Sequence, residues 1–133
     1  MIVPEQASRL RQGIAFKMQR LIGLLEVVKE RTHILPGSVY RRGRRCGKRG
    51  CRCCRGELHM GLVLTVQKEG KSRWVSLEGL DKEKVQQLVR DWRRFRMVRS
   101  EILHTFRDLL SEVDQLGRMR QVDLRDLDHK ERE

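Results

Sequence analysis

The sequence predicts a mainly helical α+β protein, in which two long helices flank a cysteine-rich loop and a short β-hairpin. Apolar residues recur at intervals of three and four over residues 4–31 and again over residues 82–116, which is the period of an amphipathic helix. Between these stretches lie all four cysteines, followed by two short runs rich in Val, Leu, Thr and Trp. With 133 residues, 38% of them hydrophobic and 36% charged, the chain suits one elongated domain whose helices pair as a hairpin or a coiled coil.

The first segment, residues 1–35, is predicted to form a helix from about residue 4 to residue 31, with Pro4 tolerated in its first turn. Gly13 and Gly23 interrupt this helix, and each costs about 1 kcal/mol relative to alanine. Either they permit a close approach of the backbone to a neighbour, or the helix is locally weak there. The spacing of its apolar stripe predicts one buried face, formed by Leu10, Ile14, Met18, Leu21, Leu25 and Val28 and widened by Ile22 and Leu24.

The second segment, residues 36–79, is predicted to hold the loop and the hairpin. Pro36 and Gly37 end the first helix, and residues 38–61 show neither helical nor strand periodicity, so we expect a loop there. Residues 62–67 and 72–77 then read as two strands, with Gly70 supplying the positive φ of the turn between them. Because an isolated hairpin is marginally stable, we expect it to pack against the loop or a helix.

The third segment, residues 80–117, is predicted to be a single long helix with Asp81 as its N-cap. Its length of about 54 Å requires a long partner, which is either the first helix or a second copy of the chain. Arg99 interrupts the apolar seam; it either favours a specific register or an acidic partner, or extends its side chain outward. The seam is spaced 3-4-3-4-3-4-3-4-3 and comprises Val85, Leu88, Trp92, Phe95, Arg99, Ile102, Phe106, Leu109, Val113 and Leu116.

Partner binding is expected at the centre of this seam, and a charged tail is expected beyond it. The predicted interface consists of Trp92, Phe95, Arg99, Ile102 and Phe106. Gly117 ends the strict pattern, and the fourth segment, residues 118–133, alternates charges with few large apolar groups. We therefore expect these last residues to be frayed or to depend on a partner for their order.

No targeting or membrane-spanning segment is visible in the sequence. The first residues lack a basic stretch followed by an apolar one, and no apolar run approaches the roughly 18 residues that a span needs. We therefore expect a cytoplasmic protein with no membrane partner. In that reducing compartment, clustered cysteines favour metal ligation or reactive thiols over disulfides.

The cysteines and one histidine have the spacing Cys46-x4-Cys51-x-Cys53-Cys54-x4-His59. A structural zinc site needs four ligands in a tetrahedron, and Cys46, Cys51, Cys53 and His59 supply three thiolates and an imidazole. Adjacent cysteines rarely bind one ion together, so Cys54 is expected to be a free thiol. The hypothesis that competes with zinc is a set of unmetallated or redox-active thiols.

Positive charge is concentrated in the same region of the chain. The formal net charge is +12, and residues 36–75 carry eleven Lys and Arg residues against two acids, whereas residues 76–133 are neutral. A basic patch of this kind favours nucleic acid, DNA or RNA, over a merely solvated loop. Trp74 either stacks on a base or anchors the hairpin. The residues expected to contact nucleic acid are Arg41, Arg42, Arg44, Arg45, Lys48, Arg49, Arg52, Arg55, Lys71 and Arg73.

The motif in residues 35–99 resembles a small uncharacterised prokaryotic family with a G-S, C-G-K, C-x-C and H-G-P-Y pattern ahead of a β-hairpin and a long helix. Members of that family often appear near mobile genetic elements. The resemblance implies zinc binding by the three cysteines and the histidine of the motif, and this chain departs from the pattern after that histidine, where Met60-Gly61-Leu62 follows. The matching residues are Gly37, Ser38, Arg41, Cys46, Gly47, Lys48, Cys51, Arg52, Cys53, Gly56 and His59.

These observations predict a non-catalytic protein. The four zinc ligands fill every position of a tetrahedron, whereas a catalytic zinc keeps one position open, and no nucleophile–base arrangement or phosphate-binding glycine loop is visible. We expect a basic zinc-binding protein that contacts the nucleic-acid backbone with weak sequence specificity, as an accessory to a DNA- or RNA-processing system. The alternative is an adaptor, in a homo-oligomer or larger complex, whose long helix docks on a transposase, reverse transcriptase or nuclease.

Overall fold

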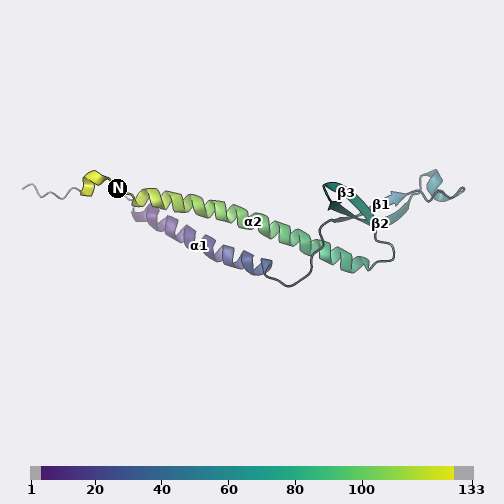
Figure 1. Ribbon diagram of the computed structural model, residues 1–133, viewed down its shortest axis with the longest axis horizontal. Helices are drawn as coiled ribbons and strands as arrows, with labels where there is room; N and C mark the ends of the chain where they lie inside the picture. Colours follow the sequence, from purple (N-terminus) through teal and green to yellow (C-terminus); the bar gives the residue numbers. More distant parts are fainter. Residues whose placement is uncertain (1–3, 128–133) are drawn as a thin grey trace, which may run out of the picture. The chain divides into compact units, whose positions relative to one another are not determined.

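The computed structural model describes residues 4–127, and within them the chain forms two compact units (Figure 1). One unit contains helix α1 and the part of helix α2 from Val98 onward; the other consists of residues 31–97. In chain order the elements are α1 (Pro4–Val28), β1 (Ser38–Arg44), the 3-10 helix η1 (Arg52–Arg55), β2 (His59–Lys68), β3 (Lys71–Ser76), α2 (Lys82–Arg120) and the 3-10 helix η2 (Leu124–Leu127).

The expected combination of two helices with a small antiparallel sheet is confirmed for the described residues, but the sheet is larger than the predicted hairpin. It has three strands in the order β1-β2-β3. β1 lies inside residues 38–61, which were expected to form a loop, and β2 begins at His59 rather than at residue 62. The physical reason is that β1 is rich in arginine and is a strand only because β2 supplies its hydrogen-bond partners.

The turn between β2 and β3 has the predicted chemistry. Lys68 pairs with Lys71, so the turn consists of the two residues Glu69 and Gly70. Both have positive φ, 55° at Glu69 and 76° at Gly70, which is the requirement of a type I′ hairpin turn. The positive φ predicted for Gly70 is therefore confirmed.

The core of the unit formed by residues 31–97 lies between one face of the sheet and the first half of α2. Leu64 on β2, Leu77 after β3 and Val89 on α2 are buried and in contact, and Leu77 has no exposed surface. The hairpin thus packs on a helix, as expected. The segment before β1 is tied to the same helix, because the Leu35 N–H donates to the Leu88 carbonyl oxygen at 3.1 Å. The core is completed by Leu35, Val39, Leu62, Val66 and Val85.

Helix α2 begins where the sequence predicts and ends later. The Lys84 N–H donates to Asp81 Oδ1 at 3.1 Å, which confirms Asp81 as the N-cap. The helix continues through Gly117 to Arg120. The predicted charged tail therefore starts inside the helix and continues into η2, and its last residues, 128–133, lie outside the described residues.

In the other unit, α1 and the second half of α2 run antiparallel and are joined by ion pairs. Lys17 on α1 contacts the Glu112 carboxylate on α2, with both side chains about one-fifth exposed. One helical turn further along α1, Arg20 pairs with Glu101 at 3.4 Å. One Glu112 oxygen, Oε2, is buried without a hydrogen-bond partner in the described residues. Charged side chains therefore occupy part of the surface between the helices.

The buried face of these helices differs from the predicted seams. In α2 the seam is right as far as Phe95, but Arg99, Phe106 and Val113 are exposed. The buried or half-buried positions of α2 after Phe95 are Val98, Glu101, Ile102, Thr105, Leu109, Glu112, Leu116 and Met119. In α1, Lys17 and Leu24 are half-buried in place of Met18 and Leu25, which are about half exposed. Most predicted seam positions are half-buried, Ile102, Leu109 and Leu116 among them, and the prediction is wrong at single positions, where contact with the other helix decides which of two adjacent residues is covered.

The two helical glycines predict a matched pair of stability changes. A Cβ at Gly13 would lie 2.8 Å from Glu112 Oε2 and would disturb the Lys17–Glu112 pair, whereas a Cβ at Gly23 meets nothing within 4 Å. Gly23→Ala is expected to stabilise the protein by about 0.5–1 kcal/mol through helix propensity, and Gly13→Ala to gain less or to destabilise it. Urea unfolding followed by circular dichroism measures both; equal stabilisation by the two variants would contradict the helix contact at Gly13.

Candidate metal centre

The cysteine-rich loop connects the ends of two paired strands. Arg44, the last residue of β1, pairs with His59, the first residue of β2, so residues 45–58 form the connection of a β-hairpin; we call this segment the knuckle. Within it η1 ends at Arg55 and is followed by Gly56, whose φ of 99° gives the left-handed C-cap that reverses the chain toward β2. The register of the strands therefore brings Cys46, two residues after Arg44, close to His59.

The knuckle gathers the four predicted ligands. The sulfurs of Cys46, Cys51 and Cys53 and a ring nitrogen of His59 all lie within 4.8 Å of one another. Cys46 Sγ lies 3.5 Å from Cys53 Sγ, and Cys51 Sγ lies 3.1 Å from His59 Nε2. A tetrahedral zinc ion, with bonds of about 2.3 Å to sulfur and 2.0 Å to nitrogen, requires ligand separations of roughly 3.5–3.8 Å. The four donors thus have a spacing that suits one metal ion.

Backbone hydrogen bonds position these sulfurs and change their acidity. The pKa of Cys53 is lowered to about 6, chiefly because the Cys46 backbone N–H donates to its sulfur at 3.4 Å. Hydrogen bonds from the Cys46 and Cys51 side chains and the charge of His59 act in the same direction and outweigh burial, which raises this pKa. Cys53 has no exposed surface. The buried sulfur at the centre of the cluster is therefore prepared to be a thiolate, the form that binds metal.

The pKa of Cys46 is shifted in the opposite direction, upward. The Lys48 backbone N–H lowers the pKa of Cys46, but the neighbouring side chains of Cys51 and Cys53 outweigh that effect, and the net shift is upward. Negative charges at this distance repel one another, so only a cation at the centre lets all three sulfurs be thiolates together.

Cys54 lies outside the cluster. Its thiol donates to the Lys48 carbonyl oxygen at 3.6 Å, and the side chain is exposed. Because Cys53 and Cys54 are adjacent in η1, their side chains point in different directions, and only Cys53 faces the other ligands. All four cysteines of the chain lie in the described residues and carry free thiols.

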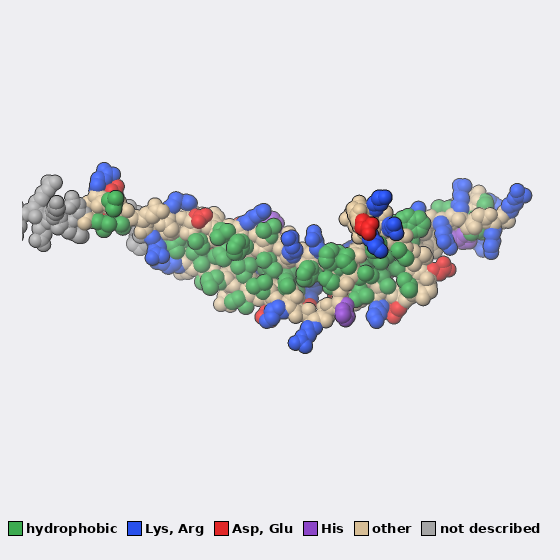
Figure 2. Space-filling model, in the orientation of Figure 1, with side chains coloured by type: hydrophobic (Ala, Val, Ile, Leu, Met, Phe, Trp, Pro, Cys, Tyr) green, Lys and Arg blue, Asp and Glu red, His purple; other side chains and the backbone are tan. Residues whose placement is uncertain are grey.

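The predicted nucleic-acid residues are all exposed, but they lie on different surfaces. Figure 2 shows Lys and Arg side chains around the knuckle. Arg42, Arg44 and Lys48 line an open cavity of about 550 Å³ together with three of the candidate metal ligands, Cys46, Cys51 and His59. Arg41 and Arg73 pair with the core-facing Leu62 and Val66, so they lie on the other face of the sheet. The positions on the knuckle itself are Arg45, Lys48, Arg49, Arg52 and Arg55, and Lys71 follows the turn.

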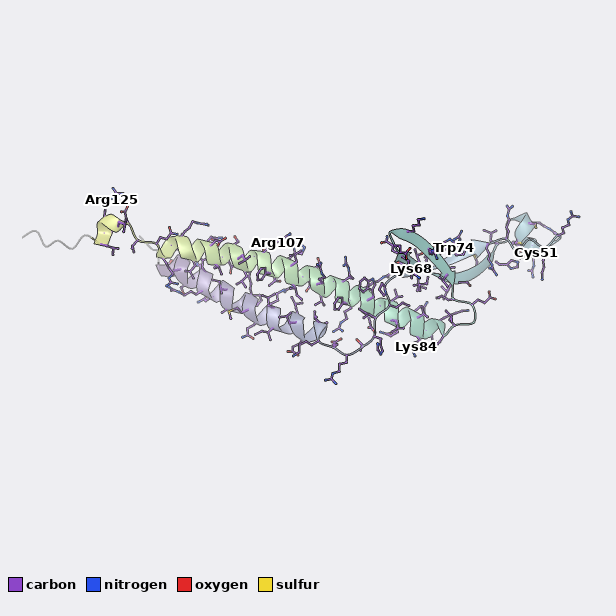
Figure 3. All side chains as sticks on the ribbon, viewed as in Figure 1. Cys51, Lys68, Trp74, Lys84, Arg107 and Arg125 are labelled. Carbon is purple, nitrogen blue, oxygen red and sulfur yellow. The ribbon has the colours of Figure 1, made fainter. Side chains whose placement is uncertain are left out.

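A contact of Trp74 was not predicted. The guanidinium carbon of Arg42 lies 3.8 Å from the centre of the Trp74 ring, and both residues line the same cavity. Figure 3 labels Trp74 on the sheet and Cys51 in the knuckle. No alternation of polar and apolar residues marks β1 in the sequence, because Arg41 stands between Tyr40 and Arg42, so this contact follows only from the pairing of β1 with β2.

The five residues of the predicted partner interface are divided between the two units. Trp92 and Phe95 are half-buried in the unit formed by residues 31–97, and their rings are stacked with centroids 6.3 Å apart. Ile102 is half-buried in the other unit, where Arg99 and Phe106 are exposed. The interface stays a prediction, and the exposed positions are its accessible part.

No family model matches the chain, and comparisons with curated proteins and with solved structures also give no match. The family resemblance of the motif therefore stays a prediction. Among residues 4–127, no helix combines the length and the apolar character that crossing a membrane requires.

Metal binding can be checked with cobalt(II), whose visible spectrum reports tetrahedral thiolate coordination. We expect one cobalt ion per chain, displaced by zinc, because the four donors fit one tetrahedral ion. Cys51→Ser should weaken cobalt binding by more than the roughly 10- to 100-fold that loss of an outer partner costs. Cys54→Ser is the matched control and should leave the spectrum and affinity unchanged, since this sulfur faces the Lys48 carbonyl. Equal effects of the two variants would show that the cluster is not the binding site.

Proposed function

We propose that this chain is a non-catalytic zinc-binding protein that binds the nucleic-acid backbone with weak sequence specificity. The observation that carries the proposal is the convergence of Cys46, Cys51, Cys53 and His59 at the base of a loop rich in arginine and lysine. A metal ion at this point holds the basic side chains of the knuckle at defined positions, which a free chain of like charges would not keep.

The donor set favours zinc over other divalent cations. Three thiolates and an imidazole are soft or borderline ligands, whereas magnesium and calcium prefer oxygen. The four protein ligands complete a tetrahedron without a water molecule, which supports a structural rather than a catalytic ion. For a small unit with few buried residues, the free energy of metal binding contributes directly to folding.

The charge of the knuckle supports a polyanionic partner. All ten predicted basic residues are exposed, and one of them, Arg44, is paired with Glu78 at 3.7 Å. Contacts to phosphates supply affinity but carry no sequence information, so such a surface binds many sequences alike. The resemblance of the motif to proteins found near mobile genetic elements supports an accessory role in a DNA- or RNA-processing system. Four free thiols suit a reducing compartment, so we place the protein in the cytoplasm.

Salt dependence tests this function. Binding of the zinc-loaded protein to labelled DNA and RNA, followed by fluorescence anisotropy, should fall with a log–log slope of about 0.9 per phosphate contact on duplex DNA and about 0.7 on single strands. Arg45→Ala, in the knuckle, should lower affinity for all sequences and reduce the slope by about 1. Arg99→Ala, an exposed arginine on α2, is the control and should change neither value. If no nucleic acid is bound at near-physiological salt, the proposal is wrong.

A second candidate function is that of an adaptor, and the exposed apolar stripes of the helices favour it. The helical pair buries Thr105 and half-buries Lys17 and Glu112, while large apolar residues at heptad spacing are about half exposed. An isolated pair would place its apolar residues inside, so this arrangement favours a further helical partner, such as a second copy or a nucleic-acid enzyme, in an extended coiled coil. The exposed stripes are Met18, Ile22 and Leu25 on α1 and Leu103, Phe106, Leu110 and Val113 on α2.

The adaptor is tested by a charge placed in the stripe. Phe106→Asp combined with Leu110→Asp should dissociate any oligomer seen by sedimentation, because both side chains are exposed in the single chain and a buried carboxylate disfavours association. Nucleic-acid binding should persist. Met97→Asp, an exposed apolar residue outside the stripe, is the control and should leave the assembly intact. A wild-type protein that is monomeric and is retained by no protein of its host would sink the adaptor.

A further inference from the structure

We propose that the outer face of the sheet, the face opposite the core, stacks an unpaired base on Trp74, so that the preferred substrate is single-stranded nucleic acid. This inference rests on the proposed function and names the substrate class of the same site. It differs from backbone binding in requiring the base itself.

The strand register defines this outer face. Residues on β2 alternate between the two faces, and the core takes Leu62, Leu64 and Val66. The opposite face therefore carries the intervening residues of β2 and the residues that pair with them across β1 and β3. It comprises Ser38, Tyr40, Arg42 and Arg44 on β1, His59, Gly61, Val63, Thr65 and Gln67 on β2, and Ser72, Trp74 and Ser76 on β3.

Trp74 is not the packing anchor of the hairpin. It is 53% exposed, although tryptophan is a residue that hairpins usually bury, and Tyr40 on the same face is 42% exposed. Val63, which pairs with Tyr40 on this face, is only 6% exposed. Covering an exposed aromatic ring with a flat ligand removes apolar surface from water. Aromatic residues that stack on bases are exposed in this way in the free protein.

Arg42 orients the ring. Its guanidinium carbon lies 3.8 Å from the ring centre, within cation–π distance, and it covers one face of the indole. Trp74 is nevertheless 53% exposed, so part of its ring remains open to solvent. A ring held in one orientation loses less conformational entropy when a flat ligand stacks on it.

Beside the ring the surface is open and concave. Gly61 has no side chain, and a Cβ built there meets nothing within 4 Å. Trp74, Gly61 and Val63 line the cavity of about 550 Å³ that continues to the knuckle. This volume falls in the range of small-ligand sites, roughly 300–1,000 Å³. The cavity therefore has room for a base beside the indole.

The charge of the cavity selects an anionic ligand. Its wall carries four basic side chains and one carboxylate, that of Glu78. A flat aromatic group next to phosphate fits this combination of indole and cations. In a duplex the faces of the bases are covered by their neighbours, so a base in a single strand is the form that reaches the ring. The four basic residues are Arg42, Arg44, Lys48 and Lys82.

The intrinsic fluorescence of Trp74 can report whether a base stacks on its ring. Trp92→Phe leaves Trp74 as the sole tryptophan of the zinc-loaded full chain. We expect its fluorescence to be quenched by single-stranded oligonucleotides of DNA or RNA, but not by an abasic oligonucleotide of the same length and charge. Trp74→Ala should weaken binding of the labelled single strand by about 5- to 150-fold, as expected for one stacked base. Trp74→Phe should retain most of the affinity, because it keeps a ring.

The possible outcomes distinguish base stacking on Trp74 from binding of the nucleic-acid backbone. If normal and abasic oligonucleotides bind equally and the fluorescence does not change, the stacking site is overturned and backbone binding stands. If no oligonucleotide binds, both fail. If an acidic polypeptide binds through Trp74 and nucleic acid does not, the ligand class is wrong. The cobalt spectrum of Trp74→Ala must match that of the wild type, which shows that the knuckle is intact.

Discussion

The meeting of four ligand atoms at the paired ends of β1 and β2 is the constraint on which the site depends. The knuckle concentrates positive charge, and like charges at short range oppose its compact form. The N–H of Cys46 favours the thiolate of Cys53, whereas Cys51 and Cys53 raise the pKa of Cys46. A divalent cation bound at the centre would allow all three sulfurs to be thiolates together. The proposed zinc therefore serves the sheet as well as the loop, because it ties Cys46, after β1, to His59 at the start of β2.

The sheet serves two purposes through its two faces. One face packs Leu64 against Val89 and leaves a small hydrophobic core, for which a metal ion is a suitable supplement. The other face presents Trp74 and its cation partner to solvent, next to the knuckle. Binding chemistry on one side and packing on the other follow from the two-residue repeat of a strand. A single change of register would exchange them.

Helix α2 makes different contacts in the two units. Its first half supplies Val85 and Val89 to the core of residues 31–97. Its second half contacts α1 through a surface that includes ion pairs, while Phe106 and neighbouring apolar residues are exposed. The polar residues Lys17, Thr105 and Glu112 among the covered positions reduce the apolar area that the two helices bury between them. The exposed apolar stripes of this unit are therefore the surface on which we expect a helical partner to bind.

The sequence by itself determined what depends on neighbouring residues: the two helices, the Asp81 cap, the turn at Gly70 and the four metal donors. Each follows from local periodicity, one side chain's hydrogen bond or the spacing of ligands. Only the tertiary structure decided that β1 is a strand, that Arg99 is exposed while Val98 is buried, and that Trp74 lies on the open face. These depend on pairing between distant residues: β2 supplies the hydrogen bonds of β1, and α1 decides which of two adjacent α2 positions is covered.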